Sequence, residues 1–289
     1  MPIDKTEWRS LEETANRLRK LTLDTVNWAG GGHIGGAMSS MDVLTVLYHH
    51  VLNFSAEKKD DPGRDRFVLS KGHIGVGMAP VLADLGCFPM EWLQDFSRIL
   101  SPLGMHLDAG KVPGLEASTG SLGHGLSLAV GMALGARYQG QTWRTYCLMG
   151  DAETDEGSIW EAAMSAAHYR IDSLCAIVDV NHAMIDGMTT DVMNLEPYPD
   201  KWRAFGWNVI EVSGSDIPAL VDAFEKAEAT KGAPSLILMD TVKGEGIDFM
   251  EGDYTWHYGS VDEAKYEAGA ASLERHLQKR LAIIEGKEA

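Results

Sequence analysis

Residues 145–181 read TYCLMGDAETDEGSIWEAAMSAAHYRIDSLCAIVDVN, and this stretch decides the fold. The apolar runs 145–149 and 174–180 each have the length of a strand, and the helical pattern between them covers 158–169. A strand, a helix and a second strand in this order form a unit whose two strands lie parallel in one sheet. The stretch therefore predicts an α/β protein.

The same alternation continues on both sides of this unit. Towards the N-terminus we expect three helices: one at 6–29, a second that begins after a capping box at 39–42, and a third at 126–138. A short strand is expected at 67–70. Towards the C-terminus we expect strands at 208–212 and 235–241, a helix at 218–229 and a long, polar surface helix at 262–287. Continuously apolar strands are typical of a parallel sheet covered by helices on both faces. Since no repeat or linker divides the chain, we expect residues 1–289 to form a single domain with a helical C-terminal tail.

Composition excludes several classes of protein. The 289 residues include 25 Lys and Arg against 42 Asp and Glu, a net charge of −17 that argues against binding to nucleic acid. No apolar run reaches the roughly 18–20 residues that span a bilayer, and the charged N-terminus lacks the apolar core of a signal peptide. Cys87, Cys147 and Cys175 show no metal-binding spacing, which favours free thiols in a reducing compartment. We therefore expect a cytoplasmic protein that binds neither nucleic acid nor membranes.

Polar side chains follow two of the expected strands. Asp151 comes directly after the strand that ends at Met149, and Asn181 follows the next strand. Ligands of parallel sheets bind beyond the carboxyl ends of the strands, and carboxylate and amide oxygens suit Mg²⁺ or Ca²⁺ better than zinc. A helix beginning near Gly157 would point its N-terminus at this site and favour an anion. Because Asp and Asn are also common turn residues, the spacing alone leaves a purely structural role open.

Histidines are concentrated in glycine-rich segments. His33, His73 and His124 each follow a glycine, His106 lies in the glycine-rich stretch 104–125, and His257 follows a tryptophan. Their spacing does not fit a zinc site. A single histidine is usually structural, but this pattern indicates imidazoles that loops present to a polar or anionic ligand.

Four stretches in a fixed order carry a family resemblance. They are GGHIGGA at 31–37, DRFVLSKGH at 65–73, PGLEASTGSLGHG at 113–125, and Gly150-Asp151-Ala152 followed by Asn181 and Ile185-Asp186-Gly187. Together they resemble the N-terminal, thiamine diphosphate-binding half of transketolase over nearly the whole chain. The run GSIWEA at 157–162 is similar to split transketolases, whose two halves are separate chains.

The resemblance implies roles for individual residues. Asp151, Asn181 and the backbone carbonyl of Ala183 would bind Mg²⁺, for which Ca²⁺ or Mn²⁺ could substitute. Contacts with thiamine diphosphate would come from His73, Gly120, Leu122, Gly150, Asp151, Ala152, Glu156, Asn181, Ile185 and His257. The catalytic histidines that face the substrate would be His33, His73, His106 and His257. Of these residues, Glu156 matches a family glutamate at the interface with the other half.

The resemblance also implies a reaction and a partner. A transketolase transfers a two-carbon ketol unit from a ketose phosphate to an aldose phosphate, in the pentose phosphate pathway or in the breakdown of less common sugars. The glutamate that activates the cofactor belongs to the C-terminal half, which this chain lacks. We therefore expect a subunit that is inactive alone and works with a C-terminal partner chain, as an α₂β₂ assembly.

Three departures from the family pattern leave alternatives open. Ala152 stands where the family usually has glycine, which requires a negative φ at this position. Leu107 and His124 replace a common proline and glutamine and bear on the choice of sugar. The alternatives are a chain of another thiamine diphosphate enzyme, similar to the alpha chain of a 2-oxo acid dehydrogenase or to a deoxyxylulose-phosphate synthase, and a non-catalytic relative.

Overall fold

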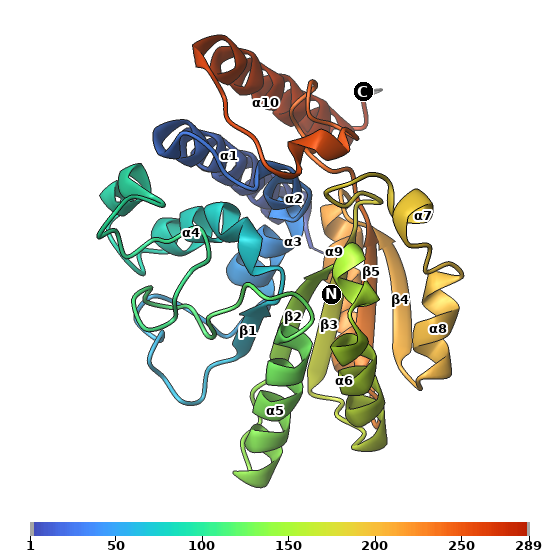
Figure 1. The fold of residues 1–289 in the computed structure, drawn as a ribbon. Helices are drawn as coiled ribbons and strands as arrows, with labels where there is room; N and C mark the ends of the chain where they lie inside the picture. Colours follow the sequence, from blue (N-terminus) through green and yellow to red (C-terminus); the bar gives the residue numbers. More distant parts are fainter. Residues whose placement is uncertain (1–2, 288–289) are drawn as a thin grey trace.

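Five parallel strands form the sheet at the centre of the computed structural model, which describes residues 3–287 (Figure 1). The strands are β1 (Arg66–Leu69), β2 (Thr145–Gly150), β3 (Leu174–Val180), β4 (Asn208–Ser213) and β5 (Ser235–Asp240). Their spatial order is β1-β2-β3-β5-β4, and every neighbouring pair is parallel. The prediction of an α/β protein with a parallel sheet is confirmed, because each apolar run expected to be a strand is one.

Helices surround the sheet and connect its strands. The α-helices are α1 (Lys5–Ala29), α2 (Ile34–Ser39), α3 (Met41–Val46), α4 (Gly75–Asp84), α5 (Gly125–Tyr138), α6 (Gly157–His168), α7 (Thr189–Val192), α8 (Tyr198–Ala204), α9 (Ile217–Ala229) and α10 (Glu263–Ile284). The shorter helical segments are the π-helix η1 (Leu47–Val51) and the 3₁₀ helices η2 (Gly72–Ile74), η3 (Met90–Asp95), η4 (Ala152–Asp155) and η5 (Tyr254–His257).

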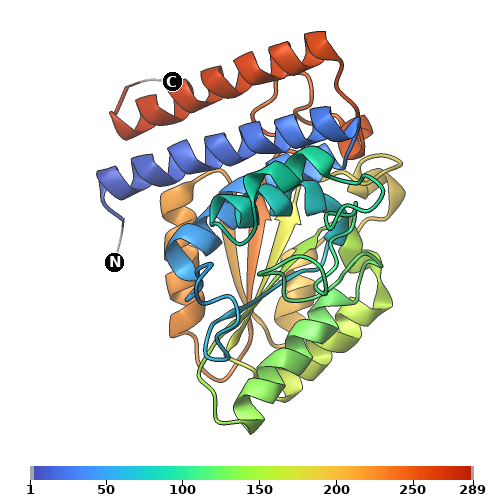
Figure 2. The ribbon, with the colours of Figure 1, turned by 90° about the vertical axis from the view of Figure 1, so that its left-hand side faces the viewer.

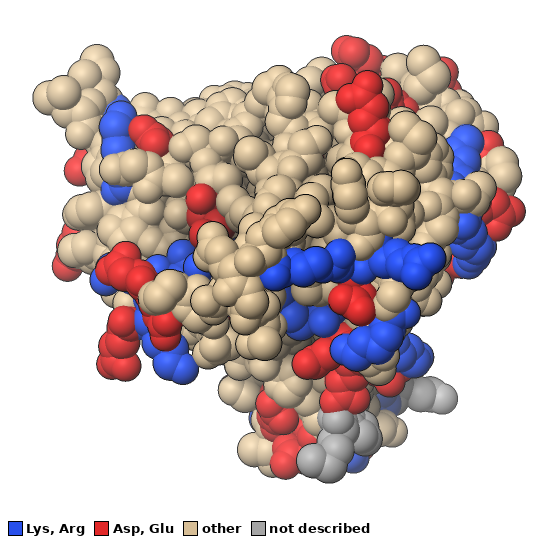
Figure 3. Space-filling view, turned by 90° about the horizontal axis from the view of Figure 1, so that it is seen from below, with Lys and Arg blue, Asp and Glu red and all other residues tan. Residues whose placement is uncertain are grey.

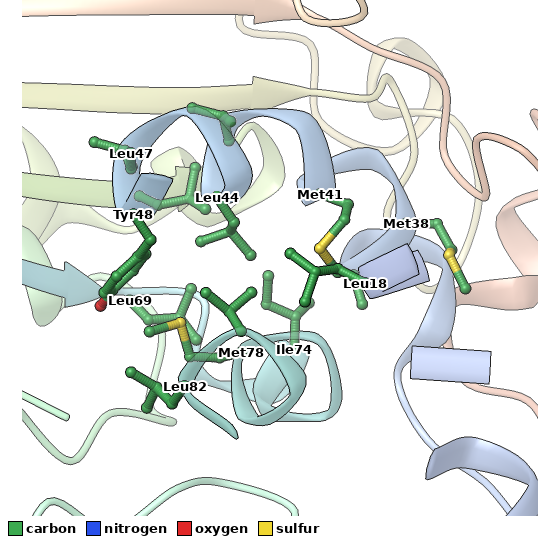
Figure 4. Packing of buried hydrophobic residues seen from close by; sticks show 14 of the residues in the cluster. Leu18, Met38, Met41, Leu44, Leu47, Tyr48, Leu69, Ile74, Met78 and Leu82 are labelled. Atoms are coloured by element: carbon green, nitrogen blue, oxygen red, sulfur yellow. The ribbon is translucent and has the colours of Figure 1, made fainter. Parts of the chain in front are cut away.

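Successive side chains of the strands pack in two separate hydrophobic clusters, one on each face of the sheet. Leu148 and Ile177 pack in the cluster formed with α1, α3, α4 and α9, whereas Cys147 and Val178 pack with α5, α6 and α8. This alternation follows from the pleat of a strand, whose successive side chains point to opposite faces. Figure 4 shows part of the first cluster, where Met78 of α4 lies among side chains of α1 and α3. Burial on both faces explains why the central strands β2 and β3 are apolar over most of their length.

Helices α1 and α10 come from the two ends of the chain and run side by side (Figure 2). Asp4 caps α1 by accepting hydrogen bonds from the backbone N–H groups of Thr6 and Glu7. The long, polar surface helix expected near the C-terminus is α10, which is exposed or partly exposed over most of its residues and buries one face. That face includes Leu273 and the guanidinium of Arg280.

The expected capping box at 39–42 is wrong. Helix α2 already covers residues up to Ser39, and no side chain caps α3. The Ser40 hydroxyl instead donates to the carbonyl of Gly36, 2.9 Å away, inside the helical segment. Ser39 donates to the Asp179 carboxylate at 2.6 Å. The Ser39 hydroxyl thus bonds a residue remote in sequence, and the Ser40 hydroxyl bonds the preceding turn of helix. A capping pattern read from neighbouring residues does not reveal either contact.

Basic and acidic side chains are interspersed on the face seen from below (Figure 3). Several surface arginines have carboxylate partners: Arg203, for example, lies 2.9 Å from Asp200. Within residues 3–287, no helix has both the length and the apolar character needed to cross a membrane.

Candidate functional site

Loops at the carboxyl edge of the sheet enclose a cavity of about 330 Å³. Its lining consists of His33, Gly36, Lys71, His73, Gly120, Leu122, Gly150, Asp151, Ala152, Glu153, Asn181, Ala183, Met184, Ile185, Asp186, Lys243 and His257. This set includes every residue to which the sequence assigned a role except His106 and Glu156. The place of the cavity agrees with the rule that ligands of parallel sheets bind beyond the strand ends.

Asp151 and Asn181, which follow two neighbouring strands, both line the cavity. The carboxylate of Asp151 accepts hydrogen bonds from the backbone N–H of Ala152 at 2.8 Å and of His182 at 2.7 Å. The side-chain oxygen of Asn181 accepts from the N–H of Ala183 at 3.3 Å. These bonds shape a turn in which His182 adopts a positive φ of 60°. The turn places Asn181 and Ala183 in the lining of the same cavity as Asp151.

The carboxylate of Asp151 is suited to a bound cation. Burial, together with the nearby Asp179 carboxylate, raises the pKa of Asp151 to about 6. A cation beside it would stabilise its charged form. Among residues 3–287, no three His, Cys, Asp or Glu side chains are grouped to hold a metal ion. A cation here would therefore also need the amide oxygen of Asn181 and a backbone carbonyl, which are donors typical of Mg²⁺ sites rather than zinc sites.

Two lysines that the sequence analysis did not single out lie in the cavity wall. Lys71 is buried and forms an ion pair with the fully buried Asp179. Lys243 is also buried, and its ammonium donates to the carbonyl of Ala183 at 2.9 Å. Burial lowers the pKa of Lys243 to about 8. Both lysines follow strands, so the strand-end rule that selected Asp151 and Asn181 could have found them.

Glu153 is a third residue that the sequence analysis missed. Its carboxylate accepts from the backbone N–H groups of Gly123 at 3.0 Å and Gly150 at 3.1 Å, and from the Ser70 hydroxyl. It therefore ties the ends of β1 and β2 to the glycine-rich loop that contains Gly120. Burial raises the pKa of Glu153.

Four histidines converge from segments that are distant in sequence. The ring of His33 lies 5.1 Å from that of His73, 5.3 Å from that of His257 and 6.2 Å from that of His106, measured between centroids. His33 and His257 are held together because Gly32 and Gly259 exchange two backbone hydrogen bonds, of 2.9 and 3.0 Å. The sequence therefore selected histidines that do lie together.

The environment keeps three of these imidazoles neutral. Burial is the main cause in each case, and it lowers the pKa of His33 and of His257 to about 4 and that of His73 to about 2. A neutral imidazole has one N–H donor and one acceptor nitrogen. The Nδ1 atom of His33 is buried and has no hydrogen-bond partner within the described residues. The cluster is therefore able to exchange hydrogen bonds with a ligand that carries hydroxyl groups.

The two assigned residues outside the cavity lining lie close to it. A Cβ on Gly120 would lie only 3.0 Å from the ring of His106, so this exposed imidazole packs against the loop that lines the cavity. Glu156 is exposed and lies beside Gly123. His124, the third histidine that follows a glycine, is exposed at the start of α5 and does not line the cavity.

The segment after Asp151 differs from the expected strand-to-helix junction. Residues 152–155 form η4, so α6 begins one short helix away and its first residues do not line the cavity. The N-terminus of α6, which we expected to point at this site, therefore lies outside the cavity lining. Ala152 is not among the residues with positive φ, which explains why its methyl group is tolerated.

Comparison with known proteins gives matches over nearly the whole chain. The family model described as "Transketolase, thiamine diphosphate binding domain" matches residues 10–283. A 6-deoxy-6-sulfo-D-fructose transketolase subunit of a Clostridium species is 43% identical over 92% of this chain and 96% of its own length. An apulose-4-phosphate transketolase subunit of Phocaeicola vulgatus is 39% identical over 93% of this chain and 96% of its own length.

Longer transketolases match only in part of their length. Human transketolase is 36% identical over 97% of this chain, which corresponds to 45% of the human protein. The solved structure of transketolase from Leishmania mexicana superposes with a TM-score of 0.82 at 30% identity, over 96% of this chain and 46% of that one. The Campylobacter jejuni transketolase structure gives a TM-score of 0.84 at 28% identity, over 95% and 46%. This chain thus spans slightly less than half the length of these enzymes.

Proposed function

The chain belongs to the transketolase family, as its thiamine diphosphate-binding domain, and from this premise we propose that it is the cofactor-binding subunit of a two-chain transketolase. The observation that carries the proposal is that the lining of one cavity includes Asp151, Asn181, two lysines and three histidines. We propose residues 1–289 as one such domain. The reaction is the transfer of a two-carbon ketol unit from a ketose phosphate to an aldose phosphate.

The residues of the cavity fit thiamine diphosphate with a divalent cation. Asp151, Asn181 and the carbonyl of Ala183 would bind Mg²⁺, with Ca²⁺ or Mn²⁺ as substitutes. The Lys243 ammonium would pair with the diphosphate, because a buried cation stabilises phosphate oxygens through charge-assisted hydrogen bonds. Gly36 lines the cavity without a side chain, and a Cβ there would lie 3.2 Å from Cγ2 of Ile74 and 3.8 Å from Nζ of Lys71. The other cofactor contacts would come from His73, Gly120, Leu122, Gly150, Ala152, Ile185 and His257, with Glu156 at the interface with the partner chain.

When bound, thiamine diphosphate supplies the carbanion chemistry that breaks and forms a carbon–carbon bond. The residues of this chain orient the substrate and handle protons. Neutral His33, His73 and His257 would donate to and accept from substrate oxygens, and would move a proton as a hydroxyl group and a carbonyl group interconvert. His106, which packs beside Gly120, would face the substrate hydroxyl groups together with these histidines. The glutamate that activates the cofactor would come from the C-terminal partner chain, in an α₂β₂ assembly.

The substrates and cellular setting follow from the same proposal. The two subunits named above are named for different sugars, 6-deoxy-6-sulfo-D-fructose and apulose 4-phosphate. We propose ketose and aldose phosphates as the substrate class of this chain, and activity measured on a panel of such sugars as the test. The enzyme would serve either the pentose phosphate pathway or the breakdown of a less common sugar. We propose a cytoplasmic location, because Cys87, Cys147 and Cys175 are buried free thiols.

The test is to recover the tagged chain from its source organism and examine it by native mass spectrometry. We expect a second chain of comparable size, thiamine diphosphate and a divalent cation, and ketol transfer only when both chains are present. Ketol transfer by the purified chain alone would disprove the need for a partner. If the recovered two-chain complex neither retains thiamine diphosphate nor binds it in calorimetry, the cofactor assignment is wrong. Asp151→Asn should abolish cation-dependent binding, and Asp155→Asn is the matched control.

A further inference from the structure

Asp179 is a buried carboxylate to which neither the sequence nor the proposed mechanism gives a role. It lies near the end of β3, has no exposed surface and does not line the cavity. One of its oxygens, Oδ2, accepts hydrogen bonds from the Ser39 hydroxyl at 2.6 Å and from Nδ2 of Asn181 at 2.9 Å, and also pairs with the Lys71 ammonium. The other oxygen, Oδ1, accepts from the Thr241 hydroxyl.

These contacts decide which way the Asn181 amide faces. An ionised carboxylate can only accept hydrogen bonds, so it must be met by the NH₂ group of an amide and not by its oxygen. The Ser39 oxygen, 3.5 Å from Nδ2 of Asn181, lies on the same side. The opposite edge of the amide then carries Oδ1, which accepts from the N–H of Ala183, and Asn181 is one of the residues that line the cavity.

Asp179 is also prevented from competing for a cation itself. Its oxygens are occupied by donors from α2 and from the loops after β1, β3 and β5, and the ammonium of Lys71 neutralises its charge. A carboxylate that is buried, paired with an ammonium group and hydrogen-bonded at both oxygens is a poor competitor for a metal ion. Asp151, which lines the cavity, is therefore the member of this pair of neighbouring carboxylates that is available to a cation.

We propose that Asp179, neutralised by Lys71, is a positioning residue that holds the Asn181 amide with its oxygen towards the cation site. This inference rests on the proposed function, because it assumes that a divalent cation binds between Asp151 and Asn181. Its distinctive content is that the strength of cation binding depends on a residue that never touches the cation. Partners of this kind commonly change metal affinity by about 10–100-fold when they are removed.

The first test replaces the carboxylate of Asp179 and the ammonium of Lys71 together, so that the net charge of the pair stays at zero. In Asp179→Asn/Lys71→Met the new amide can present either end to Asn181, so the orientation is no longer imposed. We measure Mn²⁺ affinity by electron paramagnetic resonance with thiamine diphosphate present, and cofactor affinity at saturating Mn²⁺ by calorimetry. We expect Mn²⁺ affinity to fall about tenfold or more while cofactor affinity at saturating Mn²⁺ changes less than Mn²⁺ affinity. Thr241→Val is the matched control, because it removes a donor from the other oxygen of Asp179.

A second pair of variants tests the same idea if the first does not fold. Asn181→Asp supplies a carboxylate, which should bind a hard cation more tightly than an amide does. We expect weaker Mn²⁺ binding instead, because the new carboxylate meets Asp179 with no hydrogen to donate. The exchanged variant Asp179→Asn/Asn181→Asp restores a donor and an acceptor and should recover most of the lost affinity.

The outcomes separate this proposal from the proposed function. If Asp151→Asn does not weaken Mn²⁺ binding, there is no cation site of the kind proposed, and both ideas fall. If Asp151→Asn weakens binding but Asp179→Asn/Lys71→Met binds Mn²⁺ as the Thr241→Val control does, only the positioning role is overturned. The same holds if Asn181→Asp binds Mn²⁺ as tightly as the wild-type chain.

Discussion

The Nζ atom of Lys243 lies 2.9 Å from the carbonyl oxygen of Ala183, the backbone group that we assign to the cation. The ammonium is buried, and it also lies 3.4 Å from Nδ1 of His257. A positive charge of the protein thus stands next to the proposed position of a divalent cation. Like charges at this distance repel, unless an anion such as a diphosphate lies between them.

We therefore predict opposite effects of Lys243→Met on the two ligands. Mn²⁺ without cofactor should bind more tightly, because the competing charge is gone. Thiamine diphosphate should bind about 10–100-fold more weakly, since a charge-assisted hydrogen bond is lost. Calorimetry with Mn²⁺ alone and with cofactor at saturating Mn²⁺ measures both, and Lys231→Met on the surface is the control. A change of the same sign for both ligands would contradict this account.

Glu153→Gln tests the link between the strand ends and the glycine-rich loop. A glutamine has one acceptor oxygen where Glu153 uses two, so the N–H of either Gly123 or Gly150 loses its partner. We expect the free energy of unfolding to fall by about 1–3 kcal/mol, with weaker cofactor binding as a second effect. Urea unfolding monitored by circular dichroism gives the first value. The exposed Glu161→Gln should change neither, and equal stability of the two variants would refute the role of Glu153.

The fold was predictable because its signals are local. The strand lengths and apolar runs of residues 145–180 depend only on burial on both faces of the sheet, and they appear in the sequence as periodicity. The strand-end rule then placed Asp151 and Asn181 at one edge. Sequence alone located less of the polar interior, since Lys71 and Asp179 are 108 residues apart and nothing local marks them as a pair.

The wrong capping box and the overlooked Glu153 have the same physical origin, namely contacts that only the tertiary structure creates. Ser39 and Ser40 fit a capping pattern, yet their hydroxyls reach Gly36 and Asp179, and the second of these is fixed only by tertiary packing. Glu153 follows the Gly-Asp-Ala motif and resembles an ordinary polar residue of a turn. Its role comes from two backbone N–H groups that belong to different loops. Such residues become recognisable only when the loops are brought together.

His276 makes stability depend on pH. Burial and the nearby guanidinium of Arg19 lower the pKa of His276 to about 4, and its Nε2 has no partner within the described residues. Between pH 4 and an unfolded pKa of about 6.5, the unfolded chain binds one more proton at this site, so stability rises with pH. His276→Gln should flatten this slope by up to one proton. Urea unfolding of both proteins at pH 5, 6 and 7.5 measures it, and parallel curves would show that His276 does not contribute.

Arg280 of α10 lies within a buried group of three carboxylates. Its guanidinium is 2.8 Å from Glu12, 3.4 Å from Asp42 and 3.6 Å from Glu245. Removal of one partner of a buried ion pair commonly costs about 3–5 kcal/mol, because the remaining charges stay buried. Arg280→Met should therefore lower the free energy of unfolding by that order, whereas Lys279→Met on the exposed face should not.

Arg280→Met also tests whether α10 supports the cavity through the loop that carries Lys243. Glu245 is two residues from Lys243, so loss of Arg280 leaves the loop that carries this lysine without one of its attachments. We expect Arg280→Met to bind thiamine diphosphate more weakly than Lys279→Met at a temperature where both remain folded. Calorimetry beside thermal unfolding separates the two effects. If Arg280→Met lost stability but kept its cofactor affinity, α10 would support the fold without holding the Lys243 loop in place.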